Sequence, residues 1–206
     1  EWAIAESIHP AILGFLKQRA GTAFNCPVPA TGDTYPNPRT WHKLSNDMVA
    51  NGPSWAAHPL SLAFACGTIG FETGVLFHQF AASLNEIDIN GIVEGKHVNA
   101  PSSTQPDMIY GVILELVHRI NNLVTEIDKR PGNSLQTKLT DLDISFINNI
   151  YTWVSSSPSI DLSFALLLTK FQNDLAKREL RSIQFQDPRF APSKNLILEI
   201  NKALGG

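Results

Sequence analysis

One short string, Tyr35-Pro36-Asn37-Pro38-Arg39-Thr40-Trp41, combines residue types that could bind an anion. Pro38 suits the first turn of a helix, where its missing N–H would have no partner in any case. Arg39 would then lie in that turn, where free backbone N–H groups and the positive end of the helix dipole attract negative charge. Its guanidinium adds an always-charged fork that can hold a phosphate oxygen. Arg39 is therefore a candidate anion ligand. The alternative is a surface arginine paired with an acid such as Asp47.

Other patterns for nucleotide, metal or nucleophile chemistry are incomplete. The string Gly91–His97 is one residue shorter than a phosphate-binding loop, ends in His rather than a magnesium-binding hydroxyl, and contains the acidic Glu94. We interpret it as a turn. The six histidines are dispersed, and His-Glu-x-x-His and Cys-x-x-Cys are absent, so we predict no metal site. No local nucleophile motif occurs, so we predict no catalytic residue, although a triad assembled in space stays open.

The elements that would position Arg39 are helices. Pro10, Pro38 and Pro59 each precede apolar residues at helical spacing, and after an interruption at 67–70 the pattern resumes over 72–84. An apolar stripe over 109–127 predicts the cleanest amphipathic helix of the chain. Its polar side is not basic, so we expect core packing rather than binding to a membrane surface.

Three hydroxyl residues mark further helix starts. Thr140 with Asp143 resembles a capping box, and Ser159 and Ser193 are expected to cap two later helices. Strands are hard to place, and only 87–98 leaves room for a short one. The predicted fold class is all-α. Residues 87–106 are the least regular stretch, so we predict an extended linker there, between a domain at 1–86 and a helical domain at 107–206.

Composition excludes several classes of protein. The 206 residues suffice for one large domain or two small ones, and 43% of them are hydrophobic, which excludes a mainly disordered chain. With Lys+Arg 16 against Asp+Glu 19, the net charge of −3 argues against nucleic-acid binding. No apolar run approaches the roughly 18 to 20 residues of a membrane span, so we predict no membrane insertion.

The cysteines and the start of the chain bear on its location. Cys26 and Cys66 could pair, but a single long loop is not a disulfide framework. Because both have apolar neighbours, we expect buried free thiols, which favours a reducing, cytoplasmic compartment. The sequence starts at Glu1 with neither Met nor a signal peptide. We therefore expect a processed protein or a piece of a longer one.

Residues 2–100 resemble the C-terminal part of MoxR-type AAA+ ATPases in three stretches. Residues 8–16 look like the helix near the end of the family's nucleotide-binding core. Asn37-Pro38-Arg39-Thr40-Trp41 is similar to the Pro-Arg-Ser/Thr-Trp motif that opens the family's lid. Gly67-Thr68-Ile69-Gly70, followed by Phe77 and Phe80, looks like the family's Gly-x-Val-Gly turn and Phe-x-x-Phe. Residues 88–101 are similar to the extended segment after the lid, and from Pro106 onward the likeness is only that of generic helices.

The resemblance implies that 1–86 comprise the end of an AAA+ core and a helical lid, followed by a C-terminal helical region. It assigns Arg39 the role of the "sensor 2" arginine, which contacts the γ-phosphate of ATP and couples hydrolysis to lid movement. The Walker A loop, the Walker B acids, sensor 1 and the arginine finger are absent from these 206 residues. The chain alone is therefore expected to be inactive, with ATP and Mg²⁺ bound only in a full-length parent.

The resemblance also implies partners. These are the AAA+ core of the same polypeptide, neighbouring subunits of a hexameric ring, and a protein client that in this family often contains a von Willebrand A domain. An alternative from another class is a non-catalytic, all-helical adaptor that binds proteins without nucleotide. An independent enzyme with a dispersed site is the weakest hypothesis, because the sequence has no motif for a nucleophile, a metal cluster or a pair of catalytic acids.

Overall fold

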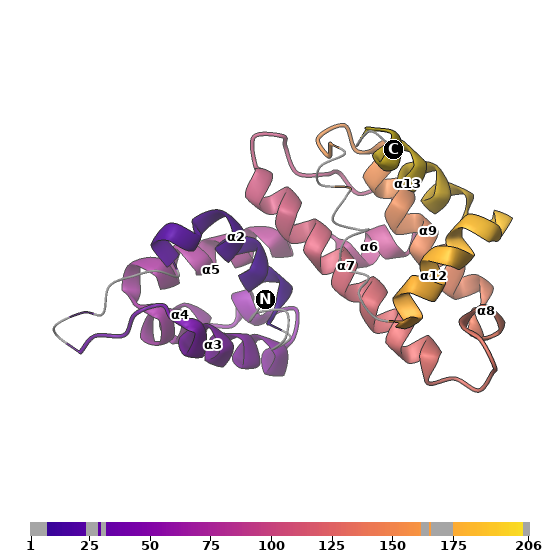
Figure 1. Ribbon diagram of the computed structural model, residues 1–206. Coiled ribbons are helices and arrows are strands. Elements are labelled where there is room, and N and C mark those ends of the chain that lie inside the picture. Colours follow the sequence, from indigo (N-terminus) through magenta and orange to yellow (C-terminus); the bar gives the residue numbers. More distant parts are fainter. Residues whose placement is uncertain (1–7, 24–28, 30–31, 162–164, 166–174, 204–206) are drawn as a thin grey trace. The chain divides into compact units, whose positions relative to one another are not determined.

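A computed structural model of the chain describes residues 8–23, 29, 32–161, 165 and 175–203. These residues form helices, turns and irregular segments and contain no strand, so the predicted all-α class is confirmed for them. The chain divides into two compact units, Glu1–Ile87 and Asp88–Gly206 (Figure 1). No helix among the described residues is both long and apolar enough to cross a bilayer.

The first unit contains four α-helices within its described residues, namely α2 (Pro10–Ala23), α3 (Pro38–Asn51), α4 (Ser61–Ile69) and α5 (Phe71–Asn85), with the 3₁₀ turn η1 (Trp55–Ala57) between α3 and α4. Pro10 and Pro38 are the first residues of their helices, as predicted, whereas α4 begins two residues after Pro59. The predicted interruption at 67–70 is confined to Gly70, because α4 continues through Gly67 to Ile69.

The core of this unit is aromatic. The rings of Phe15, Trp41 and Phe77 are fully or almost fully buried, and the centroids of each pair lie 5.4–5.9 Å apart. Tilted and edge-to-face pairs at such distances add stabilisation beyond the area that they bury. Because α2, α3 and α5 each contribute one ring, this cluster fixes the three helices relative to one another.

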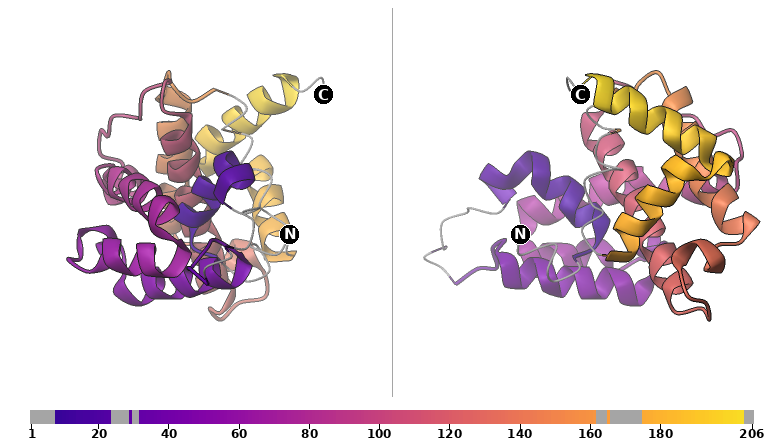
Figure 2. Two further views of the ribbon diagram at one scale, coloured as in Figure 1. Left: turned by 90° about the vertical axis from the view of Figure 1, so that its left-hand side faces the viewer. Right: turned by 45° about the vertical axis from the view of Figure 1, so that its right-hand side comes forward.

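The second unit begins with the short helix α6 (Ile89–Val93), which is followed by α7 (Pro106–Asp128), α8 (Leu135–Lys138) and α9 (Asp141–Ser156). Its last elements are α12 (Leu175–Gln186), the turn η2 (Pro188–Phe190) and α13 (Ala191–Ala203). The apolar stripe predicted for 109–127 is buried along α7. Helix α9 packs against α13 and α6, as the views in Figures 1 and 2 show.

Several local predictions were wrong in this unit. The only place left for a strand, 87–98, contains helix α6, so the predicted extended linker 87–106 is helical at residues 89–93 and irregular from Glu94 to Gln105. Ser193 does not cap the last helix, because α13 begins two residues earlier, and its hydroxyl donates to Asn148 Oδ1 at 3.1 Å. The helix expected after Ser159, and Cys26, fall largely or wholly outside the described residues.

Candidate functional site

The N-terminus of α3 is fixed by a reciprocal pair of side-chain hydrogen bonds. Thr40 N donates to Asn37 Oδ1 at 3.1 Å, and Asn37 N donates to Thr40 Oγ1 at 2.9 Å. This is a capping box with Asn37 as the N-cap and Pro38 as the first helical residue. Arg39 is therefore the second residue of the helix, in the first turn that the sequence predicts for it.

Few donors remain free at this helix end, and they belong to Arg39. Pro38 has no N–H, Thr40 N is bonded to the Asn37 side chain, and Trp41 N donates to Asn37 O at 3.0 Å. The Arg39 amide and guanidinium have no hydrogen-bond or ion-pair partner among the described residues, and the side chain is exposed. An anion that reached this end would meet one backbone donor and one permanent positive charge.

Asp47, the acid considered as a partner for Arg39, is engaged elsewhere. Trp55 Nε1 donates to Asp47 Oδ2 at 2.6 Å, and Asn51 Nδ2 donates to Oδ1 at 3.2 Å. No ion pair joins Arg39 to Asp47. The Asp47 carboxylate instead holds η1 against the C-terminal half of α3, which leaves the charge of Arg39 uncompensated by this residue.

Helix α3 is anchored to the first unit by contacts behind Arg39. The Trp41 ring is fully buried, and its Nε1 donates to Ala23 O at 2.9 Å, so α3 is held to the end of α2. One turn later the buried Ser45 Oγ accepts from His9 N at 2.9 Å, at the start of α2. These bonds satisfy polar groups that would otherwise be buried without partners, and they fix the direction of the helix.

The segment that leads into α3 lies against the turn between α4 and α5. Gly70, in this turn, has φ +85°, and a Cβ built on it would lie 2.8 Å from Thr34 O. Only glycine fits both that backbone angle and that approach. Tyr35 O, one residue along, accepts from the Thr40 side chain at 3.2 Å. The strings 67–70 and 37–41 are thus brought together in space, which their separation in the sequence could not indicate.

The string Gly91–His97 is occupied by internal contacts. Gly91 N donates to Asp88 Oδ1 at 2.7 Å, Lys96 N donates to Gly91 O at 2.8 Å, and Lys96 Nζ lies 2.6 Å from Glu94 Oε2. The pairing with Glu94 raises the pKa of Lys96 above its ordinary value. The backbone and the lysine that would bind phosphates in a phosphate-binding loop are used within the chain. The interpretation of this string as a turn holds only for Glu94 and Gly95, because residues 91–93 are the end of helix α6.

One serine and one histidine come within hydrogen-bond distance in the first unit. Ser61 Oγ lies 2.9 Å from His78 Nε2, and the same nitrogen lies 3.1 Å from Ala56 O, which can only accept. A proton on Nε2 satisfies that contact, and the buried Ser61 hydroxyl donates to His58 O at 2.7 Å. With its proton directed away from the ring, Ser61 is a structural link between η1, α4 and α5 rather than an activated nucleophile.

No group of three or more His, Cys, Asp or Glu side chains that could hold a metal ion occurs among the described residues. The surroundings of Cys66 differ from those predicted, because this free thiol is half-buried rather than buried, with Sγ 3.6 Å from Phe71 O. In comparisons with known proteins, no family model, no curated protein and no solved structure matches the chain.

Proposed function

We propose that this chain is the lid and C-terminal helical region of an ATP-dependent remodelling ATPase of the MoxR-type AAA+ class, in which Arg39 contacts the γ-phosphate of ATP. The observation that carries the proposal is an exposed arginine without a partner among the described residues, on the first turn of a helix that is capped and anchored. The resemblance of 37–41 to the motif that opens the family's lid supports the same role for Arg39.

The chemistry of this arrangement suits a sensor of the terminal phosphate. A γ-phosphate carries charge that a guanidinium can hold with two hydrogen bonds, and hydrolysis removes that group from the end of the nucleotide. Because the Trp41 ring packs against the Phe77 ring of α5, with 5.4 Å between centroids, a displacement of Arg39 would move α3 together with α5 rather than be absorbed by a flexible side chain. Arg39 would thus couple the state of the nucleotide to the position of the lid.

Under this proposal, the other parts of the ATPase lie outside this sequence. The AAA+ core would bind ATP and Mg²⁺, would supply the Walker A and Walker B residues, and would assemble with neighbouring subunits into a hexameric ring. The client would be a protein, with a von Willebrand A domain protein as the candidate that the family resemblance offers. The chain on its own would bind no nucleotide tightly and hydrolyse none.

The first test is to read the coding sequence immediately upstream of Glu1. A Gly-x-x-x-x-Gly-Lys-Ser/Thr loop followed by Walker B acids would support the lid. A start codon just upstream, with no core before it, would overturn the sensor and leave the helical adaptor as the function to pursue.

The second test measures ATP turnover by the full-length parent. We expect Arg39→Ala to lower kcat by about tenfold or more, which corresponds to about 1.4 kcal/mol of lost transition-state stabilisation, and Arg39→Lys to recover part of it. Lys43→Ala is the matched control, because it removes an equal charge from the same helix one turn later, where Lys43 lies over the Phe64 ring. Equal turnover in the Arg39→Ala and Lys43→Ala variants would refute the proposed role.

A further inference from the structure

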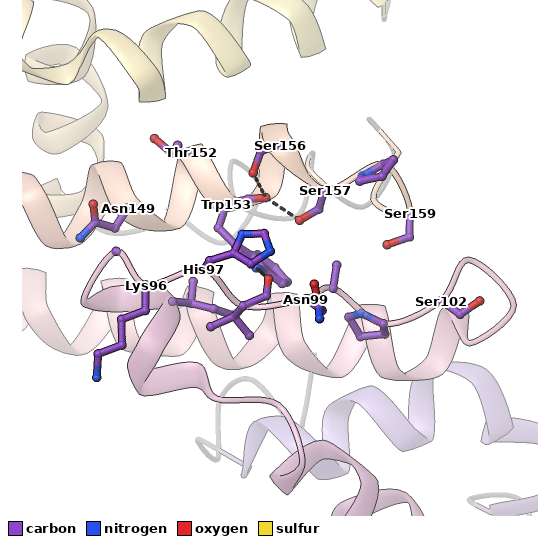
Figure 3. Close-up of a pocket in the computed structure, with 16 residues that line it drawn as sticks. Lys96, His97, Asn99, Ser102, Asn149, Thr152, Trp153, Ser156, Ser157 and Ser159 are labelled. Carbon is purple, nitrogen blue, oxygen red and sulfur yellow. Dashed lines mark hydrogen bonds between the residues drawn. The ribbon is translucent and has the colours of Figure 1, made fainter.

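The second unit contains a groove that the proposed function does not use. Its volume is about 620 Å³, and it runs between the irregular 96–102 segment and the C-terminal end of α9 with residues 157–159 (Figure 3). Lys96, His97, Asn99 and Ser102 come from the first wall, and Asn149, Thr152, Ser156, Ser157 and Ser159 come from the second. A cavity of this size is in the range of sites that hold small molecules or short peptide segments.

The irregular wall is held in place by side chains of α9. Trp153 Nε1 donates to Val98 O at 2.7 Å, and Asn149 Nδ2 donates to Val93 O at 3.0 Å. Gly95, with φ +77°, turns the chain out of α6 at the start of the segment, and a Cβ there would lie 3.0 Å from the Asn149 amide. The 96–102 segment is therefore a positioned wall of the groove even though it has no regular structure.

The two walls offer complementary hydrogen-bonding groups. On the irregular wall, the amides of residues 97–100 have no acceptor in the described part of the chain, whereas those of Lys96 and Ser102 donate to Gly91 O and Gln105 Oε1. On the α9 wall, the hydroxyls of Ser156 and Ser157 both donate to Trp153 O, at 3.2 and 2.6 Å, as Figure 3 shows. With their protons committed, these two oxygens can only accept from a ligand.

The groove combines apolar surface with polar groups and is close to neutral. All the residues that line it are described, and none of them is Asp or Glu. The charge of Lys96 is matched by Glu94, which lies outside the lining. A site for a phosphate or a nucleotide would be expected to have uncompensated cations, and a site for a metal cation would be expected to have carboxylates. The lining therefore favours a neutral ligand that both donates and accepts hydrogen bonds.

We propose that this groove binds an extended polypeptide segment of a partner protein through main-chain hydrogen bonds. An extended chain presents N–H and C=O groups at both of its edges, so it can meet donors on one wall and acceptors on the other. The 96–102 segment spans roughly 20 Å when extended, which matches a partner segment of about five to seven residues. The proposal concerns the second unit alone and does not depend on the role of Arg39.

The test uses the whole 206-residue chain and synthetic peptides of about seven residues, taken from a selection of displayed random peptides on this chain. Amide hydrogen exchange is then measured on the unsubstituted chain with and without the bound peptide. We expect exchange to slow by about fivefold or more at alternate residues within 97–100, because only the N–H groups on the edge that faces the peptide become hydrogen-bonded. A peptide methylated on its backbone nitrogens should bind about tenfold more weakly or worse, since its donors are removed.

Thr152→Trp provides the matched substitution, because the exposed Thr152 lines the groove and an indole there would fill it. Its control is Ser145→Trp, two turns earlier on the same helix, exposed and outside the lining. We expect only Thr152→Trp to weaken peptide binding, by about tenfold or more. Three results would overturn the proposal: no peptide whose binding protects alternate residues within 97–100, equal binding by the two tryptophan variants, or protection of the same amides by pyrophosphate and by no peptide.

Discussion

Asp143 is a single carboxylate that serves both a helix cap and an ion pair. Its Oδ2 accepts from Thr140 N at 2.8 Å and from Thr140 Oγ1 at 2.7 Å, while Arg130 Nη2 donates to Oδ1 at 3.1 Å. Burial by itself raises the pKa of this carboxyl, but the hydrogen bonds from Arg130 and Thr140 outweigh it, so the pKa lies below its ordinary value. The end of α7 and the start of α9 are therefore joined through a group that must be ionised.

This arrangement makes the stability of the second unit depend on pH. A carboxyl with a depressed pKa in the folded state contributes stability above its unfolded pKa of about 3.9, and that contribution is lost as the pH falls through the folded pKa. We expect Asp143→Asn to lower the free energy of unfolding by about 1–3 kcal/mol at neutral pH, and by less at an acidic pH below the unfolded pKa of about 3.9. Urea unfolding at the two pH values measures the difference.

Asp141→Asn is the control for that experiment. Asp141 also pairs with an arginine, at 2.8 Å from Arg189 Nη1, but its side chain is 89% exposed. Exposed pairs contribute about 0–1 kcal/mol, so this variant should change stability little at either pH. A destabilisation by Asp143→Asn that was equally large at acidic and neutral pH would contradict the proposed ionic contribution.

At this scale the sequence predicted what is local and missed what is not. The capping box of Thr140 and Asp143 and the place of Arg39 in a first turn both follow from spacings of a few residues, and the structure has both. Arg130 is thirteen positions from Asp143, and Trp41 is eighteen from Ala23, and the two members of each pair do not share a helix, so no helical period relates them. Those contacts depend on how the helices fold back on one another, which periodicity does not encode.

At the scale of elements, α5 crosses α4 at close range at Gly74. A Cβ built on Gly74 would lie 2.5 Å from Cys66 Cα and 2.6 Å from Cys66 N. Both atoms belong to the backbone, so neither can move aside without shifting the helix. Gly67, also helical, has no atom within 4 Å of such a Cβ. The same substitution should therefore have opposite effects at the two glycines.

We expect Gly74→Ala to lower the free energy of unfolding by about 2 kcal/mol or more, because overpacking against backbone forces the helices apart. Gly67→Ala should raise it by about 0.5–1 kcal/mol, since alanine loses less conformational entropy in a helix. Equilibrium unfolding in urea compares the two variants under identical conditions. If the Gly74→Ala variant were as stable as the native chain, α4 and α5 could not cross as closely as described here.

Long helices were predicted from the sequence more accurately than short ones. Residues 106–128 form a long helix whose stripe covers several turns, so its period could be read from sequence. Helix α6 has only five residues and depends on its Asp88 cap and on packing against α9. Neither produces a periodic pattern of apolar residues in the sequence. The start of α13 was misplaced because the turn Pro188–Phe190, capped by Asp187, leads directly into it, and Ser193 is buried inside the helix.

At the scale of the whole molecule, the two units have cores of different character. Aromatic rings dominate the first, around Phe15, Trp41 and Phe77, while the second is built largely from the aliphatic stripe of α7 and its counterparts on α9 and α13. Composition reflects this difference only in part, because three of the four tryptophans precede residue 90 but the eleven phenylalanines divide into six before it and five after it. A separate core in each unit gives each one its own source of cooperativity.

Separate cores lead to a prediction for unfolding of the intact chain. We expect Gly74→Ala to shift the thermal transition of the first unit downward by about 8 °C or more, given about 4–8 °C per kcal/mol for a domain of this size. Asp143→Asn should shift only the transition of the second unit. Scanning calorimetry of the native chain and both variants would resolve the two components. If each substitution lowered one single cooperative transition, the chain would unfold as one body, and a lid that responds separately to a phosphate on Arg39 would lose its physical basis.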